Sequence, residues 1–160
     1  MKREKIRFLI MDVDGTLTDG KIYIGNDGEM MKAFHVRDGY GIKNIAMAGG
    51  IIPVIITARD SRIVVRRCKE LGIEEVHQGC NDKMMKLKEI LMRYGSSPSA
   101  VAYIGDDIAD LECMRFVKDN GGVTGCPNDS VLEIKEIADF ITPCKGGEGA
   151  VRDFIHWLIS

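Results

Sequence analysis

The chain has 160 residues, 45% of them hydrophobic and 29% charged, which suits one domain with a hydrophobic core, expected over residues 1–160. The net charge of -2 at pH 7 does not mark a binder of nucleic acid or of membrane surfaces, and no apolar run approaches the roughly 18 residues of a membrane helix. Five scattered cysteines without a Cys-x-x-Cys pair favour free thiols in a reducing cytoplasm over disulfides or a zinc site.

Short apolar runs alternate with amphipathic segments along most of the chain. The predicted elements, in chain order, are a strand at 8–11, a hairpin at 21–34, a helix at 39–48, a strand at 51–56, a helix at 61–71, a weak strand near Val76, a helix at 83–94, a strand at 101–104, a helix at 110–117, weak strands near Val123 and at 140–141, and a helix at 150–158. Such alternation predicts an α/β fold, a Rossmann-like three-layer sandwich in which helices cover both faces of a mostly parallel sheet.

The hairpin expected at 21–34 interrupts this alternation as an insert after the first strand, with a glycine-rich turn at 25–28. A hairpin that projects from a parallel sheet has two exposed edges, which must be paired or shielded. Pairing with other subunits would cover them.

Two carboxylates, Asp12 and Asp14, follow the first predicted strand directly. Like charges at this spacing repel, so a cation is expected between them, and oxygen ligands suit magnesium. A calcium loop of the EF-hand type is the rival interpretation, but it needs glycine at its sixth position and glutamate at its twelfth. Here the glycine comes fourth and Tyr23 comes twelfth. A solvated acidic turn is the other alternative.

Three further candidates follow other predicted elements. Asp106, Asp107 and Asp110 come after the strand at 101–104, where Asp106 would supply a third metal carboxylate and Asp110 would otherwise be a helix cap. Thr57 ends the strand at 51–56 and could bind an anion at the strand–helix junction, and Lys83 begins its own helix. The carboxyl ends of parallel strands share one edge of the sheet, so these groups are expected to meet there.

Taken in series, these pieces resemble the haloacid dehalogenase superfamily of phosphotransferases. The resemblance rests on four motifs: D-x-D-G-T at residues 12–16, Thr57, Lys83, and G-D-D-x-x-D at residues 105–110.

The resemblance implies a magnesium-dependent phosphatase that forms an aspartyl-phosphate. Asp12 would be the nucleophile, and Asp14 would protonate the leaving oxygen and later activate water. The metal would be held by the Asp12 side chain, the Asp14 backbone carbonyl and the Asp106 side chain. Asp107 would orient a metal-bound water, with Asp110 beside it. The phosphoryl oxygens would be held by Thr57, Ala58 and Lys83.

A narrower resemblance covers residues 6–158. The segments 18–20, 34–39, 58–61 and 146–152 are similar to the 3-deoxy-D-manno-octulosonate 8-phosphate phosphatases, although that family usually has glycine where Ala58 stands. The likeness implies a homotetramer in which the hairpins join in a central barrel and a neighbouring subunit completes each active site. Arg59 would bind the sugar acid, and Arg67 would reach into the next subunit's site, unless it only pairs with Glu70 on the helix surface.

Two alternatives remain open from the sequence. The substrate could be a nine-carbon acylneuraminate or deaminated neuraminate 9-phosphate, although the related enzymes tend to carry an acid where Arg59 stands. The chain could instead be a non-catalytic oligomerisation partner of a sugar-acid cytidylyltransferase. Retention of the complete motif set argues against a pure scaffold.

Overall fold

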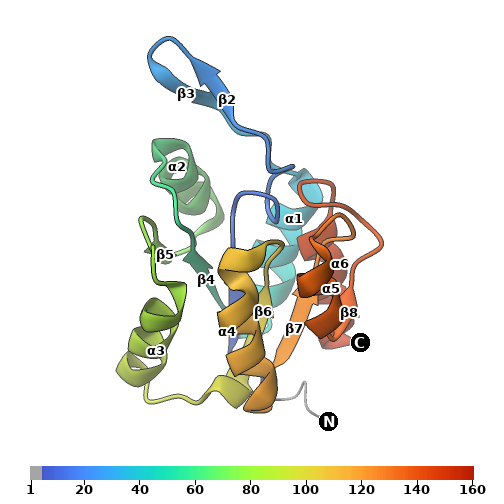
Figure 1. The fold of residues 1–160 in the computed structure, drawn as a ribbon. Coiled ribbons are helices and arrows are strands. Elements are labelled where there is room, and N and C mark those ends of the chain that lie inside the picture. The colour runs from blue at the N-terminus through green and yellow to red at the C-terminus, as the bar shows by residue number, and fades with distance from the viewer. Residues whose placement is uncertain (1–4) are drawn as a thin grey trace.

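The apolar run Phe8–Met11 forms β1, a fully buried strand at the centre of a six-stranded sheet (Figure 1). The computed structural model describes residues 5–160, so the first four residues of the domain expected over 1–160 lie outside it. The strand order is β5-β4-β1-β6-β7-β8 and each neighbouring pair is parallel. The other strands of the sheet are β4 (Ile52–Ile56), β5 (Glu75–His77), β6 (Val101–Ile104), β7 (Val123–Cys126) and β8 (Phe140–Ile141).

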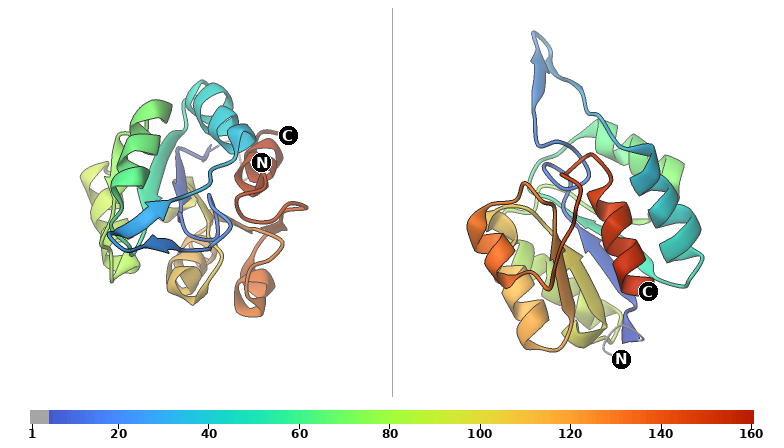
Figure 2. Two further views of the ribbon diagram at one scale, coloured as in Figure 1. Left: turned by 90° about the horizontal axis from the view of Figure 1, so that it is seen from above. Right: turned by 90° about the vertical axis from the view of Figure 1, so that its right-hand side faces the viewer.

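Helices cover both faces of the sheet, which gives the three layers expected from the sequence (Figure 2). One face packs against the π-helix η2 (Gly41–Met47), α2 (Arg62–Leu71) and α6 (Ala150–Ile159), and the short helix α1 (Val36–Tyr40) lies against η2 and α6. The opposite face packs against α3 (Lys83–Arg93), α4 (Ile108–Asp119) and α5 (Leu132–Ile137), and the short 3-10 helix η3 (Pro98–Ala100) leads into β6. Alternate β1 side chains enter the two cores, with Leu9 on one face and Phe8 on the other.

The register of β1 fixes where its last residues emerge. Met11 pairs with Ile55 of β4 and with Ile104 of β6, so the three strands end at nearly the same level. After β1, the chain adds β4 and β5 on one side of it and then β6, β7 and β8 on the other side. This change of side makes the carboxyl edge beside β1 a topological switch point, the usual ligand site of open α/β sheets.

The insert after β1 is an antiparallel hairpin of β2 (Tyr23–Gly25) and β3 (Gly28–Met31), joined by a two-residue turn. It projects from the body of the molecule, above the carboxyl edge of the sheet (Figure 1). Its ladder is shorter than the 21–34 span of the insert because the two flanking segments lie outside the pairing.

Two elements of the structure differ from the sequence prediction. The helix expected at 39–48 begins at Val36, because the His35 side chain accepts a hydrogen bond from the Arg37 N–H, and it widens into the π-helix from Gly41. The six-residue helix α5 was not expected, since its N-cap residue Val131 has no capping side chain. Within residues 5–160, no helix combines the length and apolar character that crossing a membrane requires.

Candidate active site

Asp12 is the first residue after β1, and its side chain is almost completely buried. The chain then turns sharply, with Gly15 at φ +89°, a backbone conformation that side chains disfavour. A Cβ atom at Gly15 would collide with the Asp106 carboxylate, so only glycine allows the two loops to approach this closely. Thr16 completes the contact, because its hydroxyl donates to Oδ1 of Asp106 at 3.1 Å.

Three carboxylates converge at this edge. Oxygen atoms of Asp12, Asp106 and Asp110 lie within 4.8 Å of one another. Burial, together with the other two carboxylates, raises the pKa of Asp106 well above its ordinary value. Burial and the charge of Asp110 likewise raise the pKa of Asp12.

Lys83 lies at the start of α3 and reaches this cluster from the neighbouring element. Its Nζ atom is 3.0 Å from Oδ1 of Asp12 and 2.8 Å from Oδ1 of Asp110. Burial alone would lower the pKa of Lys83, but the two carboxylates outweigh it and raise the pKa, so the ammonium stays charged. This placement agrees with the sequence interpretation of Lys83 as a site residue.

Both carboxylate oxygens of Asp110 accept hydrogen bonds from other groups of the protein. Its Oδ1 accepts from the Tyr103 hydroxyl at 2.9 Å as well as from Lys83, and its Oδ2 accepts from the backbone N–H groups of Asp106 and Asp107 at 3.2 and 3.5 Å. With Asp107, the N-cap residue, it also forms the capping box that starts α4, so the alternative role of Asp110 at a helix start is present beside its place in the cluster.

The remaining carboxylates fit a divalent cation. Asp12 and Asp106 face each other, and the neighbouring charge of Asp12 contributes to the raised pKa of Asp106, so the pair is costly without a cation between them. An all-oxygen donor set matches the preference of Mg²⁺. Asp110 lies within the same cluster but has its oxygens occupied, which leaves Asp12 and Asp106 to supply the metal carboxylates.

Asp14 lies beside the cluster and is partly exposed. Its Oδ1 is 2.6 Å from Nζ of Lys32 at the base of the hairpin, and its Oδ2 is 3.8 Å from Nε of Arg59. Arg59 therefore lies close to Asp14, and its expected role in binding the sugar acid stays a prediction. Thr57 follows β4 at the same sheet edge with 2% of its surface exposed, and Ala58 comes next on the exposed surface.

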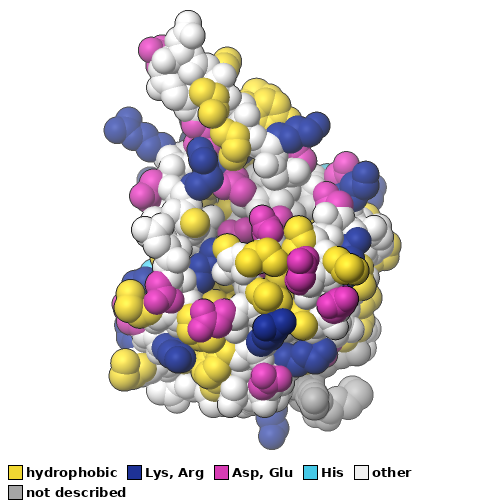
Figure 3. Space-filling model, in the orientation of Figure 1, with side chains coloured by type: hydrophobic (Ala, Val, Ile, Leu, Met, Phe, Trp, Pro, Cys, Tyr) yellow, Lys and Arg dark blue, Asp and Glu magenta, His cyan; other side chains and the backbone are white. Residues whose placement is uncertain are grey.

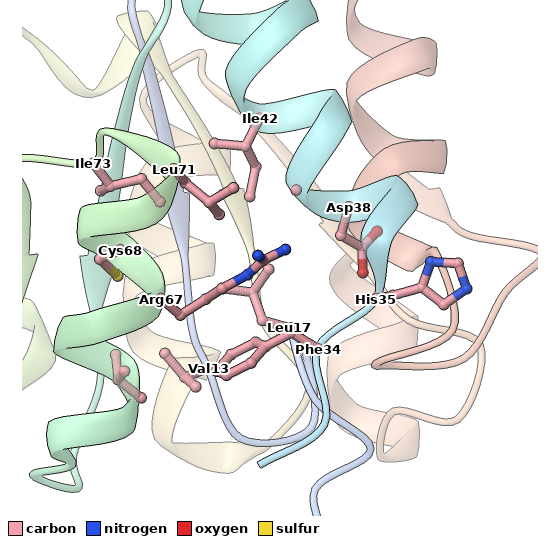
Figure 4. Close-up of a pocket in the computed structure, with 12 residues that line it drawn as sticks. Val13, Leu17, Phe34, His35, Asp38, Ile42, Arg67, Cys68, Leu71 and Ile73 are labelled. Carbon is pink, nitrogen blue, oxygen red and sulfur yellow. The ribbon is translucent and has the colours of Figure 1, made fainter.

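Arg67 lies elsewhere in this chain. Its guanidinium pairs with Glu70 at 3.4 Å and lies over the Phe34 ring, 5.8 Å from the ring centre. Figure 4 shows it extending into a small, largely apolar pocket between Ile42 and Phe34. Among the described residues, the structure does not bring Arg67 into contact with the carboxylate cluster of its own chain, and the alternative pairing with Glu70 is present.

The sequence analysis missed three residues at the site: Lys32, Thr16 and Tyr103 as partners of Asp14, Asp106 and Asp110. A signal existed for Tyr103, because a tyrosine in an otherwise apolar strand brings a hydroxyl that needs a buried partner. No pattern marked Lys32, whose contact with Asp14 depends on how the hairpin folds back.

Comparison with known proteins gives close relatives, although no family model matches the chain. The 3-deoxy-D-manno-octulosonate 8-phosphate phosphatase KdsC of Escherichia coli is 42% identical over 158 residues, which span 99% of this chain and 81% of that relative. The crystal structure of the Moraxella catarrhalis phosphatase of the same substrate, in complex with magnesium, phosphate and KDO, superposes with a TM-score of 0.91 at 39% identity. The alignment covers 99% of this chain and 88% of that one.

The cobalt-bound form of the deoxy-D-mannose-octulosonate 8-phosphate phosphatase of Haemophilus influenzae is similar to the same degree. Its TM-score is 0.91 at 34% identity, with 99% of this chain and 90% of that chain covered. The likeness therefore extends over the sheet, the helices and the hairpin together.

Proposed function

The chain belongs to the 3-deoxy-D-manno-octulosonate 8-phosphate phosphatase family of the haloacid dehalogenase superfamily, and from this premise we propose that it hydrolyses 3-deoxy-D-manno-octulosonate 8-phosphate. The observation that carries the proposal is the convergence of Asp12, Asp106 and Lys83 at the carboxyl edge of the sheet. A buried nucleophilic carboxylate beside a charged lysine and a second metal carboxylate suits phosphoryl transfer.

Mg²⁺ would be held by the side chains of Asp12 and Asp106 and by the backbone carbonyl of Asp14. When bound, it neutralises charge on the carboxylates and on the phosphoryl oxygens. Lys83 would add a second positive charge to the same oxygens, while Thr57 and Ala58 would bind them from the start of the β4–α2 connection. Asp107 would orient a water on the metal, and Asp110 would hold Lys83 and the loop that carries Asp106.

The reaction proceeds in two displacements. In the first, a carboxylate oxygen of Asp12 bonds to phosphorus, the bond from phosphorus to the sugar oxygen breaks, and Asp14 gives its proton to that oxygen. In the second, a water oxygen bonds to phosphorus, Asp14 takes the water's proton, and the bond from phosphorus to Asp12 breaks. Inorganic phosphate leaves, and both aspartates return to their starting forms.

A homotetramer, formed from single domains spanning 1–160, is part of the proposal. The hairpin supports it, because Ile24 and Met30 are 69% and 67% exposed on a free antiparallel ribbon, a costly surface for an isolated chain. Arg67, which contacts no carboxylate of the cluster in its own chain, would serve a neighbouring active site, and Arg59 would bind the sugar acid. A cytoplasmic location fits the five free cysteines.

The test is magnesium-dependent release of phosphate from the octulosonate ester and from nine-carbon sugar-acid phosphates. Wild type is expected to act best on the octulosonate ester, and Asp12→Asn is expected to lose at least about a thousandfold of kcat while keeping its fold. Asp119→Asn is the matched control, since Asp119 is exposed at the end of α4, outside the hairpin. Substantial turnover by Asp12→Asn would contradict the covalent mechanism, and a wild-type tetramer without phosphatase activity would favour the scaffold alternative.

A further inference from the structure

The base of the hairpin contains a buried lysine that touches the active site. The Lys32 side chain is 2% exposed, and its Nζ atom lies 2.6 Å from Oδ1 of Asp14 and 2.8 Å from Oε1 of Glu29. A lysine normally keeps its ammonium in water, so this burial requires a specific set of partners. The residue directly follows β3, which means that the hairpin determines where the ammonium lies.

The contacts continue from Lys32 into the body of the protein. Oε2 of Glu29 accepts a hydrogen bond from the Ser61 hydroxyl at 2.5 Å, and Ser61 is the N-cap of α2. The chain of contacts Asp14–Lys32–Glu29–Ser61 thus joins the loop after β1, the hairpin and the start of α2. Figure 3 shows acidic and basic side chains meeting where the hairpin joins the body of the molecule.

The two oxygens of Asp14 are held differently. Oδ1 has a short charge-assisted contact with Lys32, whereas Oδ2 is 3.8 Å from Nε of Arg59, beyond hydrogen-bond distance. The Arg59 side chain is 51% exposed and so offers little restraint. One oxygen of Asp14 is therefore held by the hairpin lysine, and the other lies outside hydrogen-bond distance of Arg59.

We propose that Lys32 is a positioning residue for Asp14, fixing one carboxylate oxygen so that the other faces the leaving oxygen and then the attacking water. This inference rests on the proposed function, in which Asp14 transfers the proton in both displacements. Proton transfer by a positioned carboxyl group contributes roughly 10²–10⁴-fold to rate, and a displacement of about 1 Å can cost roughly 10²-fold. Without the ammonium, Asp14 and Glu29 would also face each other as unscreened like charges.

Two substrates separate positioning from a merely structural role. The octulosonate ester has an alkoxide leaving group that needs a proton, whereas p-nitrophenolate leaves p-nitrophenyl phosphate without one. Lys32→Met should lower kcat on the octulosonate ester by about 30-fold and change KM less than about threefold. With p-nitrophenyl phosphate, Asp12 should still become phosphorylated, but attack by water should slow. Stopped-flow absorbance should then show a larger burst of p-nitrophenol than in wild type.

Controls keep the outcomes distinct. Lys21→Met makes the same change on the exposed first arm of the hairpin and should match wild type. Lys32→Arg restores a charged donor and should therefore recover part of kcat and reduce the burst. It also provides a second variant for the test if Lys32→Met assembles poorly.

Equal loss on both substrates without a larger burst, or a rise in KM at unchanged kcat, would overturn the positioning role. If wild type is active and Lys32→Met matches it, this inference alone fails. If wild type hydrolyses neither ester, the proposed function fails and the inference fails with it.

Discussion

The Nζ atom of Lys83 lies 2.8 Å from Oδ1 of Asp110, with 4% of the lysine side chain and none of the aspartate side chain exposed. The same Nζ atom also lies 3.0 Å from Oδ1 of Asp12, and Tyr103 donates to the same oxygen of Asp110. Asp110, whose side chain is fully buried, thus holds Lys83 next to Asp12. The relationship makes Asp110 a structural requirement of the site as well as a helix cap.

Asp110→Ala should lower the free energy of unfolding by about 3 kcal/mol, because it leaves the Tyr103 hydroxyl and two backbone N–H groups without their acceptor and removes one of two partners of Lys83. Urea denaturation without magnesium measures this loss. Glu112→Ala on the exposed face of the same helix should change the value by less than about 0.5 kcal/mol. A loss below about 1 kcal/mol for Asp110→Ala would show that water replaces its contacts.

Magnesium should stabilise the wild-type protein, since a ligand that binds only the folded state adds about 2.7 kcal/mol at a hundredfold excess over Kd. A rise in melting temperature of about 5 °C is expected, and a chelator should reverse it. Asp106→Asn should abolish this response while raising the melting temperature of the metal-free protein, because it removes one of three clustered carboxylates. Asp119→Asn at the exposed end of α4 is the control. An undiminished magnesium response in Asp106→Asn would exclude this carboxylate as a ligand.

The sheet and most of the site could be predicted because both depend on local sequence. Apolar runs such as Phe8–Met11 are buried on both sides, and the chain leaves each at a motif residue. Parallel pairing then brings Asp12 and Asp106 to the same edge without any further information. The short helix α5 lacks a capping side chain, and hydrophobic spacing does not distinguish an α-helix from the π-helix η2.

Contacts between distant segments could not be predicted in this way. Lys32 is 18 residues from Asp14, and Glu29 is 32 residues from Ser61. These pairs form only because the second strand of the hairpin returns the chain to the sheet edge, which no sequence periodicity encodes. The contact of Tyr103 with Asp110 was easier to predict, since a buried hydroxyl next to an acidic motif has few acceptors within reach.

The exposed hairpin side chains give a test of assembly. If the hairpins pair in a tetramer, Ile24→Asp places a charge in the interface and should shift the mass measured by light scattering from about four chains toward fewer. Met92→Asp on α3, at a side chain that is 77% exposed and far from the hairpin in sequence, should keep the wild-type mass. Equal masses for wild type, Ile24→Asp and Met92→Asp would show that the hairpin does not lie in the interface.

Asp38 joins α1 to the start of α6, whose N-cap residue Gly149 has no side chain that could cap the helix. Its Oδ1 accepts from the Arg152 N–H at 2.8 Å, whereas Oδ2 is the one buried side-chain oxygen or nitrogen without a hydrogen-bond partner in residues 5–160. Burial raises the pKa of Asp38 from 3.8 to about 6, and the donated backbone hydrogen bond opposes only part of this effect.

The pH dependence of stability follows from that shift. The folded state binds the Asp38 proton more tightly than the unfolded state, so raising the pH from about 4 to about 6 lowers the free energy of unfolding by up to about 3 kcal/mol. Asp38→Asn keeps an oxygen for the Arg152 N–H and cannot ionise. Its stability relative to wild type should therefore rise across this window and level off above it, as measured by urea denaturation at each pH.

Asp27→Asn, at an exposed aspartate, should show a flat difference from wild type over the same range. The sign of the Asp38→Asn difference decides between two physical effects at this site. If the variant instead loses stability relative to wild type as the pH rises, the partial positive charge at the start of α6 outweighs desolvation, and the Asp38 carboxylate stabilises the fold in its charged form. A rise in relative stability shows that the cost of burying the unpaired Oδ2 is the larger effect.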